Sequence, residues 1–85
     1  MFYVYLLRSE SFPGERYTGM TGDLVARLGE HNRGGVRHTS KFVPWVVEAY
    51  FAFRGREQAS RFERYLKSGS GRAFANRHLW PGQGE

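Results

Sequence analysis

The sequence predicts an α/β fold of the α+β type, in which a three-stranded antiparallel sheet is flanked by helices in the order β-β-α-β-α-α. Two short runs of β-forming residues lie near the N-terminus, on either side of a Pro-Gly turn signal. A third run, rich in aromatic residues, spans residues 44–53. The segments between and after these runs place apolar residues at helical spacing, which favours helices packed on a sheet.

Length and composition limit the classes of protein to consider. The 85 residues allow one domain, expected over residues 1–80, with 81–85 as a frayed tail. Hydrophobic residues make up 40% of the chain, too many for a disordered one. The absence of cysteine excludes disulfides, cysteine-based zinc sites and a cysteine nucleophile. The longest apolar stretch, residues 2–7, is too short to span a bilayer, so we expect a soluble cytoplasmic protein without membrane contact.

The first two strands are expected to form a hairpin. Residues 2–7 are dense in β-formers, residues 9–15 contain the turn, and residues 16–20 form the second strand. An antiparallel hairpin of this length can bring Tyr5 near Tyr17. Aromatic residues in strands usually serve packing, so their placement alone does not indicate a site.

A first helix is expected after this hairpin. Either Asp23 or Thr21 can cap its N-terminus through a side-chain oxygen, and the glycines of residues 32–35 can stop it. Its apolar face is predicted to consist of Leu24, Val25 and Leu28.

The second half of the chain supplies the remaining elements. Residues 36–42 are predicted to form a polar, basic loop, and residues 44–53 the third strand. A second helix is predicted over residues 57–67, and a Ser-Gly-Ser-Gly sequence then breaks it. A short third helix is predicted over residues 72–79, with Ser70 as its candidate cap.

Positive charge is concentrated in one segment. The chain carries a net charge of +5, and residues 54–77 alone hold seven basic and two acidic residues. Most of the cations are arginine, whose planar guanidinium suits bidentate contacts with phosphate. The segment therefore indicates a polyanionic partner such as nucleic acid, with a merely basic, solvated surface as the alternative.

Two helices carry polar residues at the edges of their apolar faces. Arg27 and His31 lie one turn apart on the rim of the first helix's buried stripe. Glu63 lies one turn after the small residue Ala59 on the second helix, where a carboxylate is unusual unless it is paired or bound to metal. The alternative interpretations are a snorkelling arginine, a polar histidine near a helix end, and an ion pair of Glu63 with Lys67.

The order of these residues resembles a known family. Tyr3-Val4-Tyr5 and Tyr17-Thr18-Gly19 resemble the paired elements of the GIY-YIG nucleases, although the tyrosine and the threonine replace the glycine and isoleucine of the name. The resemblance covers residues 2–78, and residues 66–76 are similar to the small stand-alone bacterial branch (YhbQ-like). It implies a set of catalytic residues in chain order: Tyr5, Tyr17, Arg27, His31, Glu63 and Asn76.

The resemblance implies a metal-dependent endonuclease that hydrolyses phosphodiester bonds. Glu63 would bind one divalent cation, Mg²⁺ or Mn²⁺, and Arg27 would stabilise charge on the phosphorus oxygens. Either Tyr5 or Tyr17 would activate or position the attacking water, and His31 would hydrogen-bond that tyrosine or relay its proton. The sequence leaves the choice of tyrosine open.

The expected partner is nucleic acid, DNA rather than RNA, with loose sequence preference and salt-sensitive affinity. A homodimer or a larger protein partner could supply specificity. Two other hypotheses remain: a non-catalytic basic module that binds DNA or RNA, and a ribosome- or RNA-associated basic protein. The residues expected to contact nucleic acid are Arg37, His38, Lys41, Arg61, Arg64, Lys67, Ser70, Arg72 and Arg77.

Overall fold

The computed structural model describes residues 1–82 and has the predicted order of elements. The strands are β1 (Phe2–Ser9), β2 (Arg16–Thr21) and β3 (Trp45–Phe53). The helices are α1 (Leu24–Asn32), a 3-10 turn (Ser40–Phe42), α2 (Arg56–Lys67) and α3 (Gly69–His78). The predicted fold class is confirmed, and no helix in this part of the chain is long and apolar enough to cross a membrane. Most of the expected tail, residues 83–85, lies outside the described residues.

The sheet has the strand order β2-β1-β3, and both pairs are antiparallel. The central strand β1 contains consecutive buried residues, Val4, Tyr5, Leu6 and Leu7, instead of the alternation typical of a half-exposed strand. Successive side chains point to opposite faces, so this pattern requires cover on both sides of the sheet.

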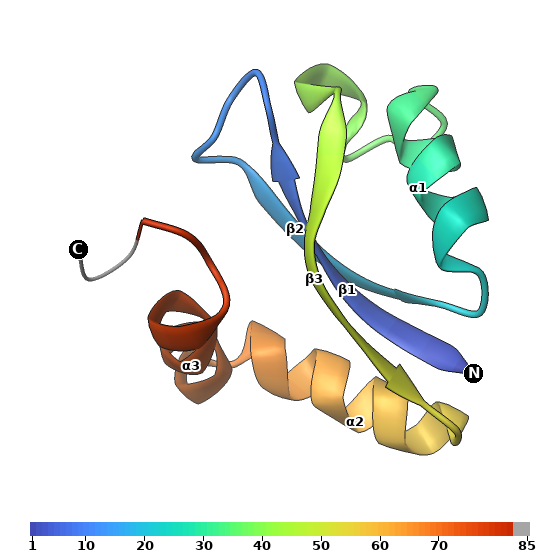
Figure 1. Ribbon diagram of the computed structural model, residues 1–85, viewed down its shortest axis with the longest axis vertical. Coiled ribbons are helices and arrows are strands. Elements are labelled where there is room, and N and C mark those ends of the chain that lie inside the picture. Colours follow the sequence, from blue (N-terminus) through green and yellow to red (C-terminus); the bar gives the residue numbers. More distant parts are fainter. Residues whose placement is uncertain (83–85) are drawn as a thin grey trace.

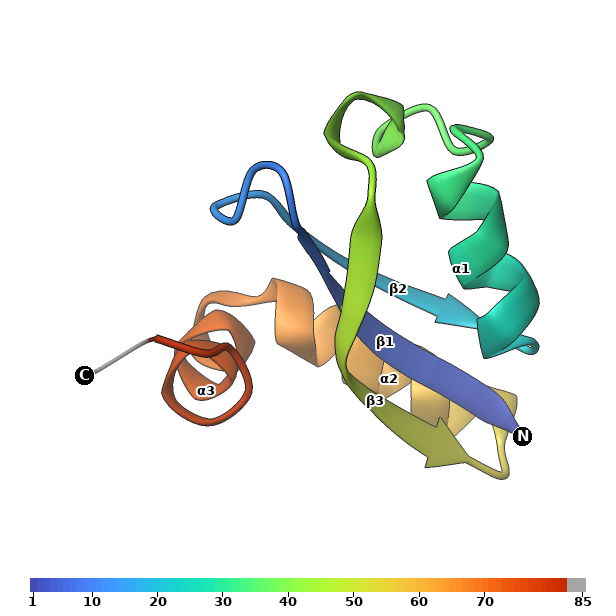
Figure 2. The same ribbon diagram turned by 45° about the horizontal axis from the view of Figure 1, so that its top comes forward.

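Helices cover the two faces of the sheet separately (Figures 1 and 2). On one face, Val4 and Leu6 pack with residues of α2 and α3 and with Trp80. On the other face, Tyr5 and Leu7 pack with Trp45 and with the leucines of α1. The central strand therefore contributes to two separate cores. Its even-numbered side chains pack against α2 and α3, and its odd-numbered side chains pack against α1.

Helix α1 begins and ends as its sequence indicates, but one apolar residue points outward. Asp23 is the N-cap, because its carboxylate accepts a hydrogen bond from the Ala26 amide at 3.1 Å. Gly34 adopts a positive φ of 78° just after the helix, which provides the glycine stop. Val25 is 84% exposed, so its predicted place on the apolar face is wrong. The inward stripe instead runs along Leu24, Leu28 and the buried His31, about 100° away from Val25.

The link between the last two helices differs from the prediction. Only Ser68 separates α2 from α3, and its hydroxyl, not that of Ser70, caps α3 by accepting the Gly71 amide at 3.2 Å. A glycine-rich sequence favours a break between helices, but the close approach of α2 and α3 requires a residue without a side chain within α3. The predicted loop over residues 36–42 also differs from the prediction, because it contains a 3-10 turn.

Gly71 lies where α3 packs against the backbone of α2. A Cβ added to Gly71 would overlap the carbonyl oxygen of Tyr65 in α2, a backbone atom that cannot move aside. We expect Gly71→Ala to lower the free energy of unfolding by about 2 to 3 kcal/mol through overpacking, despite the better helix propensity of alanine. Urea unfolding measures this change. Gly69→Ala is the matched control, since its Cβ would meet nothing within 4 Å, and an equal effect of both variants would contradict the packing argument.

Candidate active site

The hairpin brings the two tyrosines together, as expected. Tyr5 lies opposite Gly19 in the β1–β2 pairing, and the ring centroids of Tyr5 and Tyr17 are 6.2 Å apart. The Tyr5 ring crosses the backbone of β2 at Gly19, where an added Cβ would lie 2.5 Å from the Tyr5 hydroxyl and 2.9 Å from the Tyr17 ring. The absence of a side chain at Gly19 therefore provides the space that the tyrosine pair occupies.

Gly19→Ala is expected to displace the Tyr5 hydroxyl from its hydrogen bond with His31. Because the added Cβ would overlap a buried ring, we expect the free energy of unfolding to fall by about 1 to 3 kcal/mol. Urea unfolding measures the change. Gly22→Ala is the control, since its Cβ would meet nothing within 4 Å. An equal effect of the two variants would contradict the close packing of Tyr5 on Gly19.

A buried chain of hydrogen bonds starts at Tyr5. Its hydroxyl lies 3.0 Å from Nε2 of His31, and Nδ1 of His31 lies 2.8 Å from the hydroxyl oxygen of Thr39. The Thr39 hydroxyl donates to the carbonyl of Val36 at 3.3 Å, so its oxygen accepts from Nδ1–H. Nε2 is then the acceptor for the Tyr5 hydroxyl. No local pattern indicated the role of Thr39, which comes from the turn after α1.

Arg27 joins this chain from the solvent side. Its Nε donates to the Tyr5 hydroxyl at 3.4 Å, and its Nη1 pairs with Glu30 at 3.1 Å. The side chain of Arg27 is 33% exposed, whereas Tyr5 and His31 are almost fully buried. The guanidinium thus lies between the buried hydroxyl and solvent, where it can meet an anion.

Burial has the largest effect on the protonation of Tyr5 and His31. It raises the pKa of the Tyr5 phenol above its usual 10, and the hydrogen bond from Arg27 only partly opposes this. Burial also lowers the pKa of His31 below its usual 6.5, and the charge of Arg27 lowers it further. The pKa of Arg27 is raised by its hydrogen bonds to Tyr5 and Glu30. At neutral pH, Tyr5 is therefore a neutral phenol beside a neutral imidazole and a charged guanidinium.

The buried His31 is expected to make stability depend on pH. Since its pKa is lowered in the folded state, the unfolded chain binds more protons as the pH falls below about 6.5. We expect the free energy of unfolding to decrease in that range by at most about 1.4 kcal/mol per pH unit. Urea unfolding between about pH 7.5 and about pH 5.5 measures this slope. His31→Gln should reduce it and the exposed His38→Gln should not; equal slopes in all three proteins would contradict the assignment.

Glu63 lies on α2, the helix that packs against the sheet on the face opposite α1 (Figure 1). Its side chain is 22% exposed and pairs with Lys67 at 3.0 Å, so the ion pair that the spacing allowed does form. Its negative charge also reaches Tyr5, where it is a small contribution to the raised pKa after burial and Tyr17. Within residues 1–82, no three His, Asp or Glu side chains gather as ligands for a metal ion. Glu63 thus stands apart from any acidic cluster in this range and contacts Lys67, whereas Glu30 is the carboxylate that pairs with Arg27.

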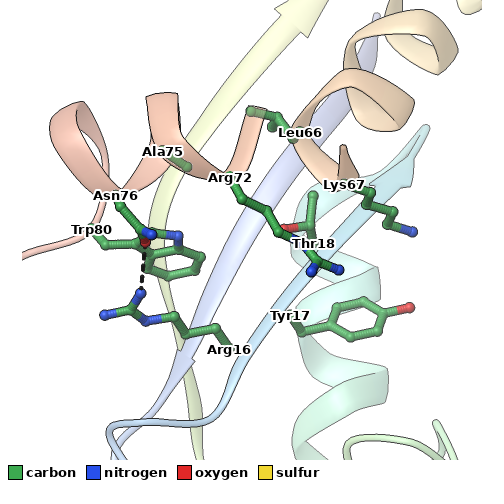
Figure 3. A pocket seen from close by; sticks show the side chains of 9 residues that line it. All are labelled: Arg16, Tyr17, Thr18, Leu66, Lys67, Arg72, Ala75, Asn76 and Trp80. Atoms are coloured by element: carbon green, nitrogen blue, oxygen red, sulfur yellow. Dashed lines mark hydrogen bonds between the residues drawn. The ribbon is translucent and has the colours of Figure 1, made fainter. Parts of the chain in front are cut away.

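A cavity of about 450 Å³ lies between β2 and the last two helices (Figure 3). Tyr17 lines it from the sheet, Lys67 from the end of α2, and Asn76 from α3. Asn76 accepts a hydrogen bond from Arg16 at 3.2 Å. Tyr17 reaches the edge of this cavity, and its ring lies on the α1 face of the sheet, 5.0 Å from the His31 ring between centroids. Tyr17 is half-buried, whereas Tyr5 is only 1% exposed.

The structure distributes the basic residues over several surfaces. Lys67 and Arg72 line the cavity, whereas Ser70 and Arg77 lie on another side of α3. The remaining predicted contacts are on the turn after α1, on the 3-10 turn and on α2, and all are exposed: Arg37, His38, Lys41, Arg61 and Arg64.

Comparisons with known proteins bear on this arrangement. A family model described as the GIY-YIG catalytic domain matches residues 1–77. A UPF0213 protein of Nitratidesulfovibrio vulgaris is 37% identical over 68 residues, 79% of this chain and 60% of that protein. The solution NMR structure of a UPF0213 protein from Bacillus halodurans superposes with a TM-score of 0.55 at 31% identity, covering 98% of this chain and 92% of that one. The resemblance drawn from the motifs is confirmed.

One relative has a function in its name. The structure-specific endonuclease subunit SLX1 of Malassezia globosa is 31% identical over 83 residues, which cover 93% of this chain and 18% of that protein. The match with this chain thus spans 60% of the Nitratidesulfovibrio vulgaris protein and a small part of SLX1.

Proposed function

The chain belongs to the GIY-YIG family, and from this premise we propose that it is a metal-dependent endonuclease that hydrolyses phosphodiester bonds in DNA. The observation that carries the proposal is the hydrogen-bonded group of Tyr5, His31 and Arg27 beside the half-buried Tyr17. A structural role alone does not require an arginine, a histidine and two tyrosines on one face of the sheet. The similarity to an endonuclease subunit supports the same reaction class.

Glu63 is the residue that would hold the metal. A hard cation such as Mg²⁺ or Mn²⁺ accepts one carboxylate and several waters during phosphate chemistry, which fits a partly exposed acidic side chain outside any acidic cluster among residues 1–82. Lys67, which pairs with Glu63, is half-exposed and can turn away at small cost. When bound, the cation would supply neutralisation of the scissile phosphate and stabilisation of the leaving 3′ oxygen.

The arginine, the two tyrosines and the histidine of the site have separate roles. Arg27 binds the non-bridging oxygens of the scissile phosphate, where negative charge increases in the transition state. Tyr17 positions the attacking water, because it is half-buried and accessible from solvent, while Tyr5 is almost fully buried and has a raised pKa. Tyr5 and the neutral His31 hold the position of Arg27 and Tyr17 from behind.

We assign binding of the nucleic-acid strand to exposed side chains that would contact backbone phosphates, with loose sequence preference and strong salt dependence. These residues are Arg37, His38, Lys41, Arg61, Arg64, Lys67, Ser70, Arg72 and Arg77. We propose DNA over RNA as the substrate. A second copy of the chain or a larger partner would add specificity.

The test is a cleavage assay on labelled single-stranded, duplex and branched DNA, with single-stranded RNA alongside. Each substrate is incubated with Mg²⁺, with Mn²⁺ or with EDTA. We expect cleavage with metal and none with EDTA. Salt-sensitive binding without cleavage under any metal would reject the enzyme and leave the non-catalytic nucleic-acid-binding module. Cleavage that persists in EDTA would reject the metal.

A further inference from the structure

Arg16 is held in place at the wall of the cavity by two interactions. Its guanidinium lies over the Trp80 ring at 4.7 Å from the centroid, and its Nη1 donates to the side-chain oxygen of Asn76 at 3.2 Å. Stacking on an aromatic face and a fixed hydrogen bond restrict both the position and the plane of a side chain that is otherwise mobile. Figure 3 shows Arg16 extending from β2 beneath Asn76 and Trp80.

The Nε donor of this guanidinium has no protein acceptor. Nε of Arg16 is buried and makes no hydrogen bond to any group in residues 1–82. A buried donor without a partner is costly, and a charged one more so. The guanidinium thus has a fixed position and no protein acceptor at Nε, and an anion in the adjoining cavity would compensate its charge.

The other charged groups that line the cavity have the same sign. Lys67 and Arg72 contribute further cations, and none of the lining residues described carries a carboxylate. Arg72 lies one turn before Asn76 on α3 and extends towards β2 in Figure 3. Cations from a strand and from a helix thus flank one hollow, where a tetrahedral anion can be contacted from two sides.

We propose that this cavity is a phosphate-binding site, in which Arg16 and Arg72 bind an internal backbone phosphate of the strand next to the phosphodiester that is cut. The inference rests on the proposed nuclease function, because Tyr17 lines the same cavity and connects it to the Tyr5 cluster. The ligand is a phosphodiester of single-stranded nucleic acid. Trp80 takes part as the support of Arg16, being only 9% exposed.

The experiment measures binding without cleavage. Wild type, Arg16→Gln and Arg72→Gln are titrated against a fluorescein-labelled single-stranded DNA of about 12 nucleotides in EDTA, at several salt concentrations. We expect each variant to weaken binding about tenfold at low salt. The slope of log affinity against log salt should decrease by about 0.7 for each phosphate that the variant no longer neutralises. Arg56→Gln, an exposed arginine at the start of α2, is the matched control and should change neither quantity.

Two further measurements distinguish loss of the binding site from unfolding and from binding of a terminal phosphate. Thermal melts detect any variant that fails to fold, and the exposed Arg72 carries the test if Arg16→Gln is unstable. An oligonucleotide with a 5′-phosphate is compared with one without it. A loss of affinity confined to the phosphorylated oligonucleotide would overturn the internal-phosphate site in favour of a terminal one. Losses no larger than that of Arg56→Gln would overturn the site altogether.

The result is independent of the cleavage assay. If wild type binds through Arg16 and Arg72 but never cleaves, the binding site stands and the proposed nuclease function fails. If wild type cleaves and the two variants bind as wild type does, the nuclease function stands and the phosphate site fails.

Discussion

Replacing Glu63 with glutamine is expected to reduce the rate of metal-dependent cleavage by about 1000-fold or more, without weakening the binding of DNA. Glutamine keeps the size of the side chain and its place on α2 but removes the negative charge that a divalent cation requires. Single-turnover cleavage in Mg²⁺ and anisotropy binding in EDTA measure the two quantities separately.

The expected size of the effect follows from the scarcity of carboxylates at the site. Within the part of the chain that the structure describes, no cluster of acidic or histidine ligands can replace Glu63. The ion pair with Lys67 is part-exposed, so its loss alone should cost little stability. The effect should therefore appear in the rate and not in the melting temperature.

Glu57→Gln is the matched control for this prediction. Glu57 is an exposed carboxylate in the first turn of the same helix, so the change in net charge is identical. We expect its cleavage rate to remain within about twofold of wild type. A rate for Glu63→Gln equal to that of Glu57→Gln would remove Glu63 from the catalytic site.

The second large effect is expected for Arg27→Lys, a change that keeps the charge. We expect a loss of about 100- to 1000-fold in cleavage rate, because lysine cannot present the planar fork that donates to Tyr5 and binds phosphate at once. Measuring kcat and KM separately checks the assignment. A charge that acts only in the transition state lowers kcat, whereas a general contact with DNA raises KM.

Arg33→Lys controls for the loss of a guanidinium near α1. Arg33 is exposed at the C-cap of the helix and belongs to neither the Tyr5 cluster nor the cavity. It should leave kcat nearly unchanged. Should Arg27→Lys raise KM with an unaltered kcat, the arginine would be a contact for DNA and not a stabiliser of the transition state.

Local patterns were sufficient to predict most of the fold. The dense β-formers of β1 and the cap at Asp23 act over a few residues, so they can be recognised without a partner segment. The errors lie where a distant element overrides local preference. The glycines of α3 indicate a break, but they lie within the helix, where the closeness of α2 leaves no room for a side chain at Gly71. Val25 is apolar and was expected to face inward, but it lies off the stripe that faces the sheet.

By itself the sequence determined the order of elements and the family. It also predicted the side chains proposed to carry chemistry, among them two tyrosines, Arg27, His31 and Glu63. Only the tertiary structure decided how these side chains are arranged. Tyr17 is half-buried and Tyr5 almost fully buried, because β2 is an edge strand and β1 is the central strand of the sheet. The acceptor nitrogen of His31 depends on Thr39, and the orientation of Arg16 on Asn76, which lies 60 residues away. Side-chain directions, burial and hydrogen-bond partners are set by such distant contacts, which no local pattern encodes.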